Sequence, residues 1–197
     1  MIPPRPERFF AALRAGLLGP ELSQAEVDGC QAILGACAAW PLSWTAYALA
    51  TAYHETAHTM RPIVEHGGEA YFLRMYDCQG LRPAVAAQLG NCQPGDGRRF
   101  CGRGYVQLTG RANYARAGLA EAPDRALDPE VAAEVLERGM REGWFGRRLM
   151  DVLPLGGRAT RRQFTAARRV VNGQDRAALI ADYALRFQDA LLGGGCA

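Results

Sequence analysis

The sequence predicts a mainly α-helical protein of the α+β class, with a helical body, a small β-rich lobe at about residues 63–110 and a cleft between them. Helix-start signals and long apolar helical stretches occur before and after this region. Inside it glycines are frequent, and residues 70–75 and 105–109 have strand-like composition. The 197 residues are enough for one domain of ordinary size, so we expect a single catalytic or binding domain over residues 1–197.

The helices are predicted by start and stop signals. Ser23 and Glu26 form a capping box at the start of one helix. A second helix, over residues 44–59, can be capped by Ser43 and stopped by Pro62, and it is apolar nearly all round, as a central buried helix should be. The capping box predicts the first helix over about residues 24–39, and the other helices are predicted over about residues 129–150, 160–171 and 175–191.

Composition excludes several classes of protein. Hydrophobic residues make up 49% and charged residues 22%, which is typical of a soluble globular chain. All 23 basic residues are arginine, which excludes lysine chemistry, and a net charge of +3 does not favour nucleic-acid binding. The N-terminal residues lack the apolar stretch of a secretory signal, and no apolar run approaches the ~18 residues of a membrane span. We therefore expect synthesis in the cytoplasm, no stable membrane insertion and mostly reduced cysteines.

Residues 54–58 fit the pattern H-E-x-x-H, in which two histidines on one helical face bind zinc and the glutamate activates water. A zinc peptidase that uses His54 and His58 is therefore one hypothesis. The sequence supplies no third ligand at a recognised spacing, although His66 or Glu69 could be proposed. The alternative is that the two histidines orient neighbouring side chains by hydrogen bonds, with no metal and no cofactor.

Two glutamates on either side of Pro62 suggest acid–base chemistry. Glu55 lies near the C-terminal end of an apolar helix, where the helix dipole disfavours the anion, as suits a general acid. Glu65 can enter the predicted lobe and face Glu55 across the cleft. Opposed carboxylates about 6.5–9.5 Å apart are typical of inverting glycosidases. Glu69 is a competing candidate for the second role.

Three segments resemble glycoside hydrolase family 19, and among its members most closely the phage and prophage endolysins. They are residues 53–69 with the Tyr-His-Glu-Thr run, residues 89–114 with Gly-Arg-Gly-Tyr-Val-Gln-Leu-Thr-Gly, and residues 169–173 with Val-Val-Asn-Gly. The resemblance implies a lysozyme-like, two-lobed fold that hydrolyses β-1,4 bonds between amino sugars with inversion.

The resemblance also implies roles for particular residues. Glu55 stands at the general acid, Glu65 at the general base of the endolysin-type members, and Thr109 at the residue that positions the attacking water. The matches to polar groups that line the sugar subsites are Gln107, Asn113 and Asn172. Arg103 and Tyr105 lie in the same motif and are further candidates for substrate binding, and Arg103 is also expected to brace the lobe or the acid. Gln107 and Thr109 alternate along a predicted strand, so both should face one side.

The sequence departs from the family after the Asn-Gly turn and at Cys78, Cys92 and Cys101, which replace other residue types usual in endolysins. Plant members hold the acid with an acidic–arginine pair after the Asn-Gly turn, but residues 174–176 follow that turn at once, and the pair cannot be placed. The arginines at 158, 161, 162, 168 and 169 are expected to form a solvated helix face. Cys78 and Cys92 flank one loop and could form a disulfide after release from the cell, although free thiols are the simpler expectation.

The leading hypothesis is an endolysin that cleaves peptidoglycan as a monomer. Because no signal sequence is evident, it would act on the cell wall after release through a separate holin or another delivery machine. A chitinase that acts on chitin oligomers is the nearest alternative. Two further alternatives belong to other functional classes: a wall-binding module without catalytic activity, and the zinc peptidase.

Overall fold

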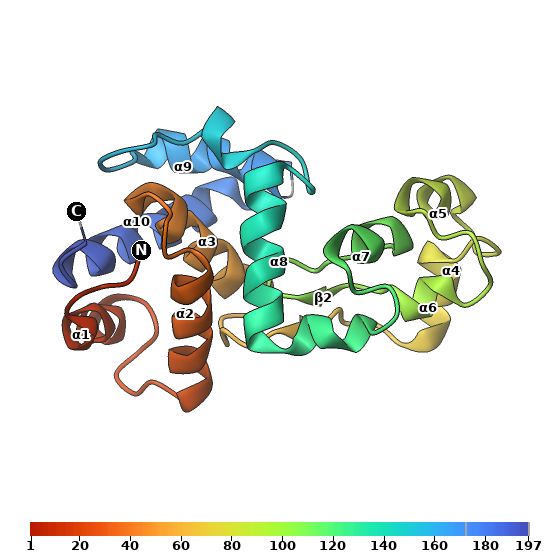
Figure 1. Cartoon of the computed structure of the whole chain (residues 1–197), viewed down its shortest axis with the longest axis horizontal. Coiled ribbons are helices and arrows are strands. Elements are labelled where there is room, and N and C mark those ends of the chain that lie inside the picture. Colours follow the sequence, from red (N-terminus) through yellow and green to blue (C-terminus); the bar gives the residue numbers. More distant parts are fainter. Residues whose placement is uncertain (172, 197) are drawn as a thin grey trace. The chain divides into compact units, whose positions relative to one another are not determined.

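The computed structural model describes residues 1–171 and 173–196. The chain divides into two compact units: unit 1 comprises Met1–Arg61 with Leu136–Ala197, and unit 2 comprises Pro62–Val135. The predicted lobe at residues 63–110 begins where unit 2 begins, but unit 2 continues to Val135. Both units consist mainly of helices (Figure 1).

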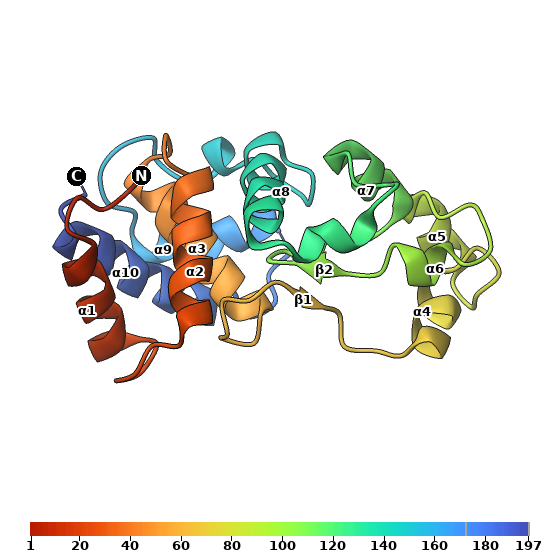
Figure 2. The same cartoon turned by 60° about the horizontal axis from the view of Figure 1, so that its bottom comes forward.

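Unit 1 is built around α3 (Leu42–Glu55), whose residues from Leu42 to Tyr53 are all buried. The prediction of a central buried helix is therefore confirmed. The helices α2 (Gln24–Ala36) and α10 (Ala177–Gly193) pack against α3, and α1 (Pro6–Gly16) and α9 (Arg161–Ala167) pack against α10 (Figure 2). The two ends of the described chain lie together, since the Arg5 amide donates to the Gly194 carbonyl at 2.9 Å.

Local signals placed the helix starts better than the helix ends. The capping box of Ser23 with Glu26 is present as predicted, and Thr160 with Gln163 forms a second one that starts α9. α8 (Pro129–Glu142) starts as predicted but ends before the predicted residue 150, because Gly143 takes a left-handed conformation with φ +77°. Two short 3₁₀ helices, η2 (Leu149–Asp151) and η3 (Arg168–Val170), follow in unit 1.

In unit 2, the described residues contain only two strands, β1 (Ile63–Val64) and β2 (Arg103–Gly104). They pair antiparallel, with Ile63 opposite Gly104. The rest of the unit is helices and loops. The helices are α4 (Glu69–Tyr76), α5 (Pro83–Leu89), α6 (Asp96–Arg99), α7 (Arg111–Ala117), η1 (Pro123–Leu127) and the first part of α8.

The prediction of a β-rich lobe is therefore wrong. Residues 70–75 lie in α4, because their aromatic side chains pack along a helix face: Phe72 is buried and stacks on Tyr76 one turn later, with ring centroids 6.4 Å apart. Residues 105–109 are a turn rather than a strand, since Gln107 has φ +54° and the chain returns so that Leu108 pairs with Arg103.

A buried carboxylate ties the loops of unit 2 together. Asp77 accepts hydrogen bonds from the amides of Gln79, Gly95 and Gly97 at 3.2, 2.8 and 3.1 Å. A side chain at Gly97 would meet the Phe72 carbonyl at 2.6 Å, so only glycine allows this approach. Burial by itself would raise the pKa of Asp77, but the three amide donors outweigh it and hold the pKa below its ordinary value.

We expect Asp77→Asn to lower the free energy of unfolding by about 2 kcal/mol at pH 7, because an amide NH₂ would face amide donors in place of an acceptor. Because the pKa of Asp77 is lowered in the folded protein, its carboxylate stabilises the fold at pH values above the ordinary pKa of 3.8. This stabilisation is lost as the pH falls through the pKa of the folded state. The deficit of the variant should therefore shrink at about pH 2.5. Urea unfolding at both pH values measures it, and an equal deficit at both would contradict the account.

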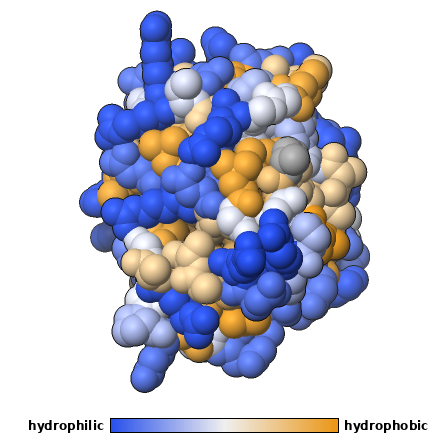
Figure 3. Space-filling model, turned by 90° about the vertical axis from the view of Figure 1, so that its left-hand side faces the viewer, coloured by the Kyte–Doolittle hydropathy of each residue, from blue (hydrophilic) through white to orange (hydrophobic). Residues whose placement is uncertain are grey.

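The surface of unit 1 seen in Figure 3 is mainly hydrophilic, with small hydrophobic patches separated by polar groups. Within residues 1–171 and 173–196, no helix combines the length and the apolar character needed to cross a membrane. All six cysteines, including Cys78 and Cys92, are free.

Candidate functional site

Glu55 is the last residue of α3 and forms an ion pair inside unit 1. Its Oε1 lies 2.8 Å from Nη2 of Arg168, and the two side chains are 16% and 1% exposed. The carboxyl group is thus held at the end of a buried helix while part of it remains accessible. Separation of the pair would leave the buried charge of Arg168 without a partner, which is costly. The carboxyl group of Glu55 is therefore held firmly in this position.

The sequence pattern predicts Arg168 on a solvated helix face, but this prediction is wrong. It is among the largest fully buried side chains, and its Nε donates to the Asp175 carbonyl at 2.9 Å. By contrast, Arg158 and Arg161 do lie on the surface, where they pair with Asp189 and Asp182. The arginine that holds the candidate acid therefore lies just before residues 172–173, whereas the family pattern predicts it after them.

The H-E-x-x-H segment does not form one helical face. The helix ends at Glu55, and the following Ala57, His58 and Met60 have positive φ, so His58 lies in a turn. His58 stacks on Tyr53 with centroids 4.4 Å apart, and its Nε2 lies 3.2 Å from the Tyr183 hydroxyl. Over the described part of the chain, no three His, Cys, Asp or Glu side chains are arranged to hold a metal ion. The geometry favours His58 as a partner of Tyr53 and Tyr183.

Glu65 follows β1 in unit 2 and accepts two hydrogen bonds. The Tyr76 hydroxyl donates to Oε1 at 2.6 Å, and the Gly102 amide donates to Oε2 at 3.2 Å. The Glu65 amide in turn donates to the Gly102 carbonyl at 2.8 Å. Burial and the adjacent carboxylate raise the pKa of Tyr76 above its ordinary value, so its phenol stays protonated and continues to donate. Neither Tyr76 nor Gly102 was identified as a functional residue from the sequence.

Gln107, Thr109 and Asn113 are linked to one another by hydrogen bonds, although not on a strand, and Gln107 lies near Glu65. Gln107 Nε2 donates to the carbonyls of Ile63 and Gly104 at 3.3 and 3.2 Å. Thr109 Oγ1 donates to the Gln107 carbonyl at 2.9 Å, and Asn113 Nδ2 donates to the Thr109 carbonyl at 2.8 Å. These hydrogen bonds hold three half-buried polar side chains in one chain of contacts. Glu65 joins them at Gly102, since its Oε2 and the Gln107 Oε1 lie over that glycine.

This arrangement makes Gly102→Ala a sensitive test. A methyl group there would lie 2.9 Å from Gln107 Oε1 and 3.0 Å from Glu65 Oε2, so both side-chain ends must move. Because those ends are flexible, we expect a small loss of stability but a fall in activity of about tenfold or more. Measurement of kcat together with the unfolding temperature checks this. Activity equal to that of the wild type would show that Glu65 needs no fixed position.

Glu69, the competing candidate, has a different environment. It is exposed on α4 and pairs with Arg98 at 3.0 Å, with side chains 56% and 64% exposed. It also borders a pocket of about 910 Å³ in unit 2, together with Asp77, Arg98 and Asp124. An exposed ion pair of this kind holds a carboxylate weakly.

Three other candidate residues need comment. Tyr105 is fully buried in the core of unit 2. Arg103 is 9% exposed and braces the unit: its Nη1 donates to two carbonyls and to the Tyr114 hydroxyl, and its Nε lies 3.1 Å from Asp124. Asn172 lies outside the described residues.

The chemistry available is that of two carboxyl groups with different partners. Glu55 pairs with the cationic Arg168 in unit 1. In unit 2, Glu65 accepts from the Tyr76 hydroxyl and the Gly102 amide and lies near the side-chain amide of Gln107. One carboxyl that donates a proton and one that accepts a proton from water are the groups used in general acid–base hydrolysis. Polar side chains such as Gln107 and Asn113 both donate and accept, as sugar hydroxyl and acetamido groups require.

A solved structure has a similar fold, although comparisons of the sequence find no match. No family model matches the chain, and no curated protein matches its sequence. Among solved structures, the crystal structure of a chitinase C mutant is similar, with a TM-score of 0.58 and 19% sequence identity, over 94% of this chain and 75% of that one. The chain therefore has a chitinase-like fold.

Proposed function

We propose that this chain is a cell-wall-degrading glycoside hydrolase that cleaves β-1,4 bonds between the amino sugars of peptidoglycan with inversion. The observation that carries the proposal is the Glu55–Arg168 ion pair at the end of the buried helix α3. This pair supports the proposal because a buried guanidinium group holds the carboxyl group of Glu55, the residue that the sequence motif proposes as the general acid. The shared fold with a chitinase supports the same class of reaction.

In this proposal Glu55 protonates the oxygen of the leaving sugar, and Glu65 removes a proton from the attacking water. Glu65 is preferred to Glu69 because Tyr76 and Gly102 hold its carboxylate next to Gln107. Thr109 shares the water through its hydroxyl group. Gln107, Asn113 and Asn172 bind the sugar. No metal or cofactor takes part.

A chitinase is the second candidate, since the similar solved structure is that of a chitinase. Both functions use the same acid–base chemistry on related amino-sugar chains. The endolysin-type motifs around Glu55 and Thr109 support peptidoglycan. Access to the wall through a holin or other delivery machine, and action as a monomer, remain predictions of the sequence.

Mass spectrometry of fragments released from purified peptidoglycan and from chitin oligomers tests the proposal. We expect glycan fragments with new reducing ends from peptidoglycan, in the presence of a chelator, and none from the Glu55→Gln variant. Preferential cleavage of chitin oligomers would select the chitinase. Release of peptides with zinc-dependent activity, or no cleavage of either glycan, would contradict a glycosidase.

A further inference from the structure

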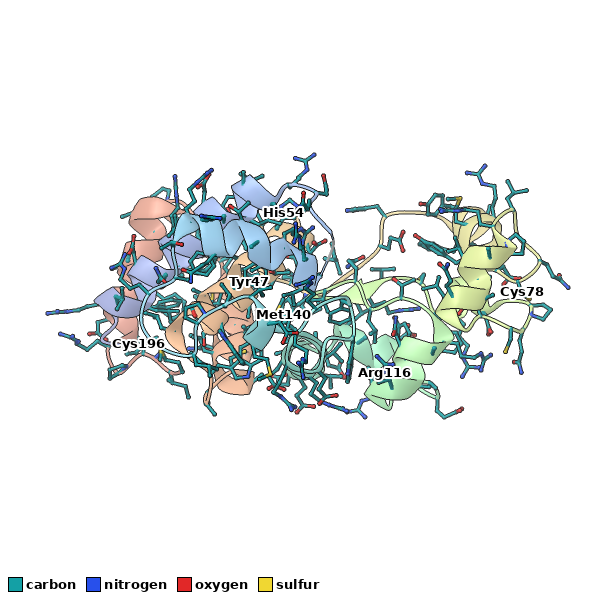
Figure 4. The ribbon with its side chains drawn as sticks, turned by 90° about the horizontal axis from the view of Figure 1, so that it is seen from above. Tyr47, His54, Cys78, Arg116, Met140 and Cys196 are labelled. Atoms are coloured by element: carbon teal, nitrogen blue, oxygen red, sulfur yellow. The ribbon has the colours of Figure 1, made fainter. Side chains whose placement is uncertain are left out.

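Three polar side chains follow one face of α3. Tyr47, Thr51 and Glu55 are spaced four residues apart, so they lie one above the other along the helix. Tyr47 and Thr51 are fully buried, in a helix whose other buried residues are mostly apolar. Figure 4 shows Tyr47 on α3 in the interior of unit 1. Buried polar groups need partners, so this face of α3 requires an explanation.

The guanidinium group of Arg168 lies at the Glu55 end of this face. Its Nη2 pairs with Glu55, and its Nε donates to the Asp175 carbonyl. Its third nitrogen, Nη1, is fully enclosed and has no well-aligned hydrogen bond among the described residues, and the same is true of the hydroxyls of Tyr47 and Thr51. Tyr47, Thr51 and Arg168 thus each carry one enclosed polar atom without an aligned hydrogen bond.

The Tyr47 hydroxyl is close enough to Arg168 and Thr51 for both to affect its pKa. Burial raises the pKa of Tyr47 to about 12, while the hydroxyl of Thr51 and the charge of Arg168 act in the opposite direction. The phenol is therefore neutral at physiological pH. A guanidinium group only donates hydrogen bonds, whereas a phenol oxygen can accept one.

We propose that Tyr47 is a positioning residue for the reaction: its oxygen accepts a hydrogen bond from Nη1 of Arg168 and fixes the guanidinium group against Glu55. The guanidinium group then has three anchors, the Asp175 carbonyl, Glu55 and Tyr47, one for each nitrogen. Thr51 lies between Tyr47 and Glu55 along this face of α3. The inference rests on the proposed function, in which Glu55 is the general acid.

Kinetics of Tyr47→Phe test the inference, because phenylalanine keeps the ring and removes only the oxygen. We expect kcat to fall about tenfold with KM nearly unchanged, since the loss of a hydrogen bond to a charged group disturbs the acid rather than substrate binding. Tyr53→Phe is the matched control: its hydroxyl donates to the Leu17 carbonyl at 3.2 Å and lies on the opposite side of α3 from Glu55. That variant should keep the kcat of the wild type.

A double-mutant cycle with Arg168→Lys separates positioning from a general structural effect. If Tyr47 acts through Arg168, Tyr47→Phe lowers kcat in the wild type but has little further effect in the Arg168→Lys background. The inference would be overturned if Tyr47→Phe lowered kcat by the same factor in both backgrounds, or if it changed KM alone. If Glu55→Gln remains active, the proposed function fails; if it is inactive while Tyr47→Phe equals the wild type, only the role of Tyr47 fails.

Nitrogen-15 NMR of the guanidinium group gives a readout that does not depend on activity. We expect the two Nη signals of Arg168 to be resolved in the wild type, because three anchors block rotation of the group. Arg168→Lys identifies these signals by removing them. In Tyr47→Phe the Nη1 signal should shift and its hydrogens should exchange faster with water, whereas an unchanged signal would overturn the inference.

Discussion

Replacement of Glu55 by glutamine is expected to lower kcat by roughly 10²–10⁴-fold, because glutamine cannot donate the proton that the leaving sugar needs. The amide still fits at the end of α3 and still accepts from Arg168, so the protein should fold. Kinetics on the glycan substrate and the unfolding temperature measure both effects.

Asp182→Asn is the matched control for Glu55→Gln. It removes a carboxylate of the same unit that pairs with an arginine, but on the surface, with Arg161 at 2.6 Å. This control should keep nearly full activity. If Glu55→Gln retains more than about a tenth of the wild-type kcat, Glu55 does not act as the general acid.

Replacement of Glu65 by glutamine is expected to lower kcat by roughly 10²-fold or more with KM nearly unchanged, since the attacking water is engaged mainly in the transition state. Glutamine can still accept from the Tyr76 hydroxyl and the Gly102 amide, so the loop should keep its conformation. Steady-state kinetics on the same substrate provide the measurement.

Glu69→Gln is the control here, because Glu69 lies four residues away and pairs only with the exposed Arg98 among the described residues. It should retain nearly full activity. The reverse pattern, an active Glu65→Gln with an inactive Glu69→Gln, would transfer the role of the base to Glu69.

The parts of the fold that the sequence predicts well are those set by neighbouring residues. The capping box at Ser23 needs only residues 23–26, and the buried helix α3 is visible as an apolar stretch. The strand-like composition of residues 70–75 was misleading because strand preference depends on packing, and here Phe72 and Tyr76 pack on one helix face. The turn at Gln107, with its positive φ, has no local signal such as glycine at that position.

The candidate site is predicted from the sequence only in part, since its partners are far apart in the chain. Glu55 and Arg168 are 113 residues apart, and the local charge pattern alone predicts Arg168 on the surface with its neighbours. Tyr76 and Gly102 reach Glu65 across 11 and 37 residues. Tyr105 was included by its place in the motif, but its side chain is in the core.

The most direct test of the central claim is the anomer first released by the enzyme. NMR spectra recorded within the first minutes of cleavage of a defined amino-sugar oligomer show which anomer forms before mutarotation. Hydrolysis with Glu55 as acid and Glu65 as base predicts that the new reducing end is initially the α anomer. An initial β anomer would mean retention through a covalent intermediate, and it would contradict the assignment of Glu65 as the base.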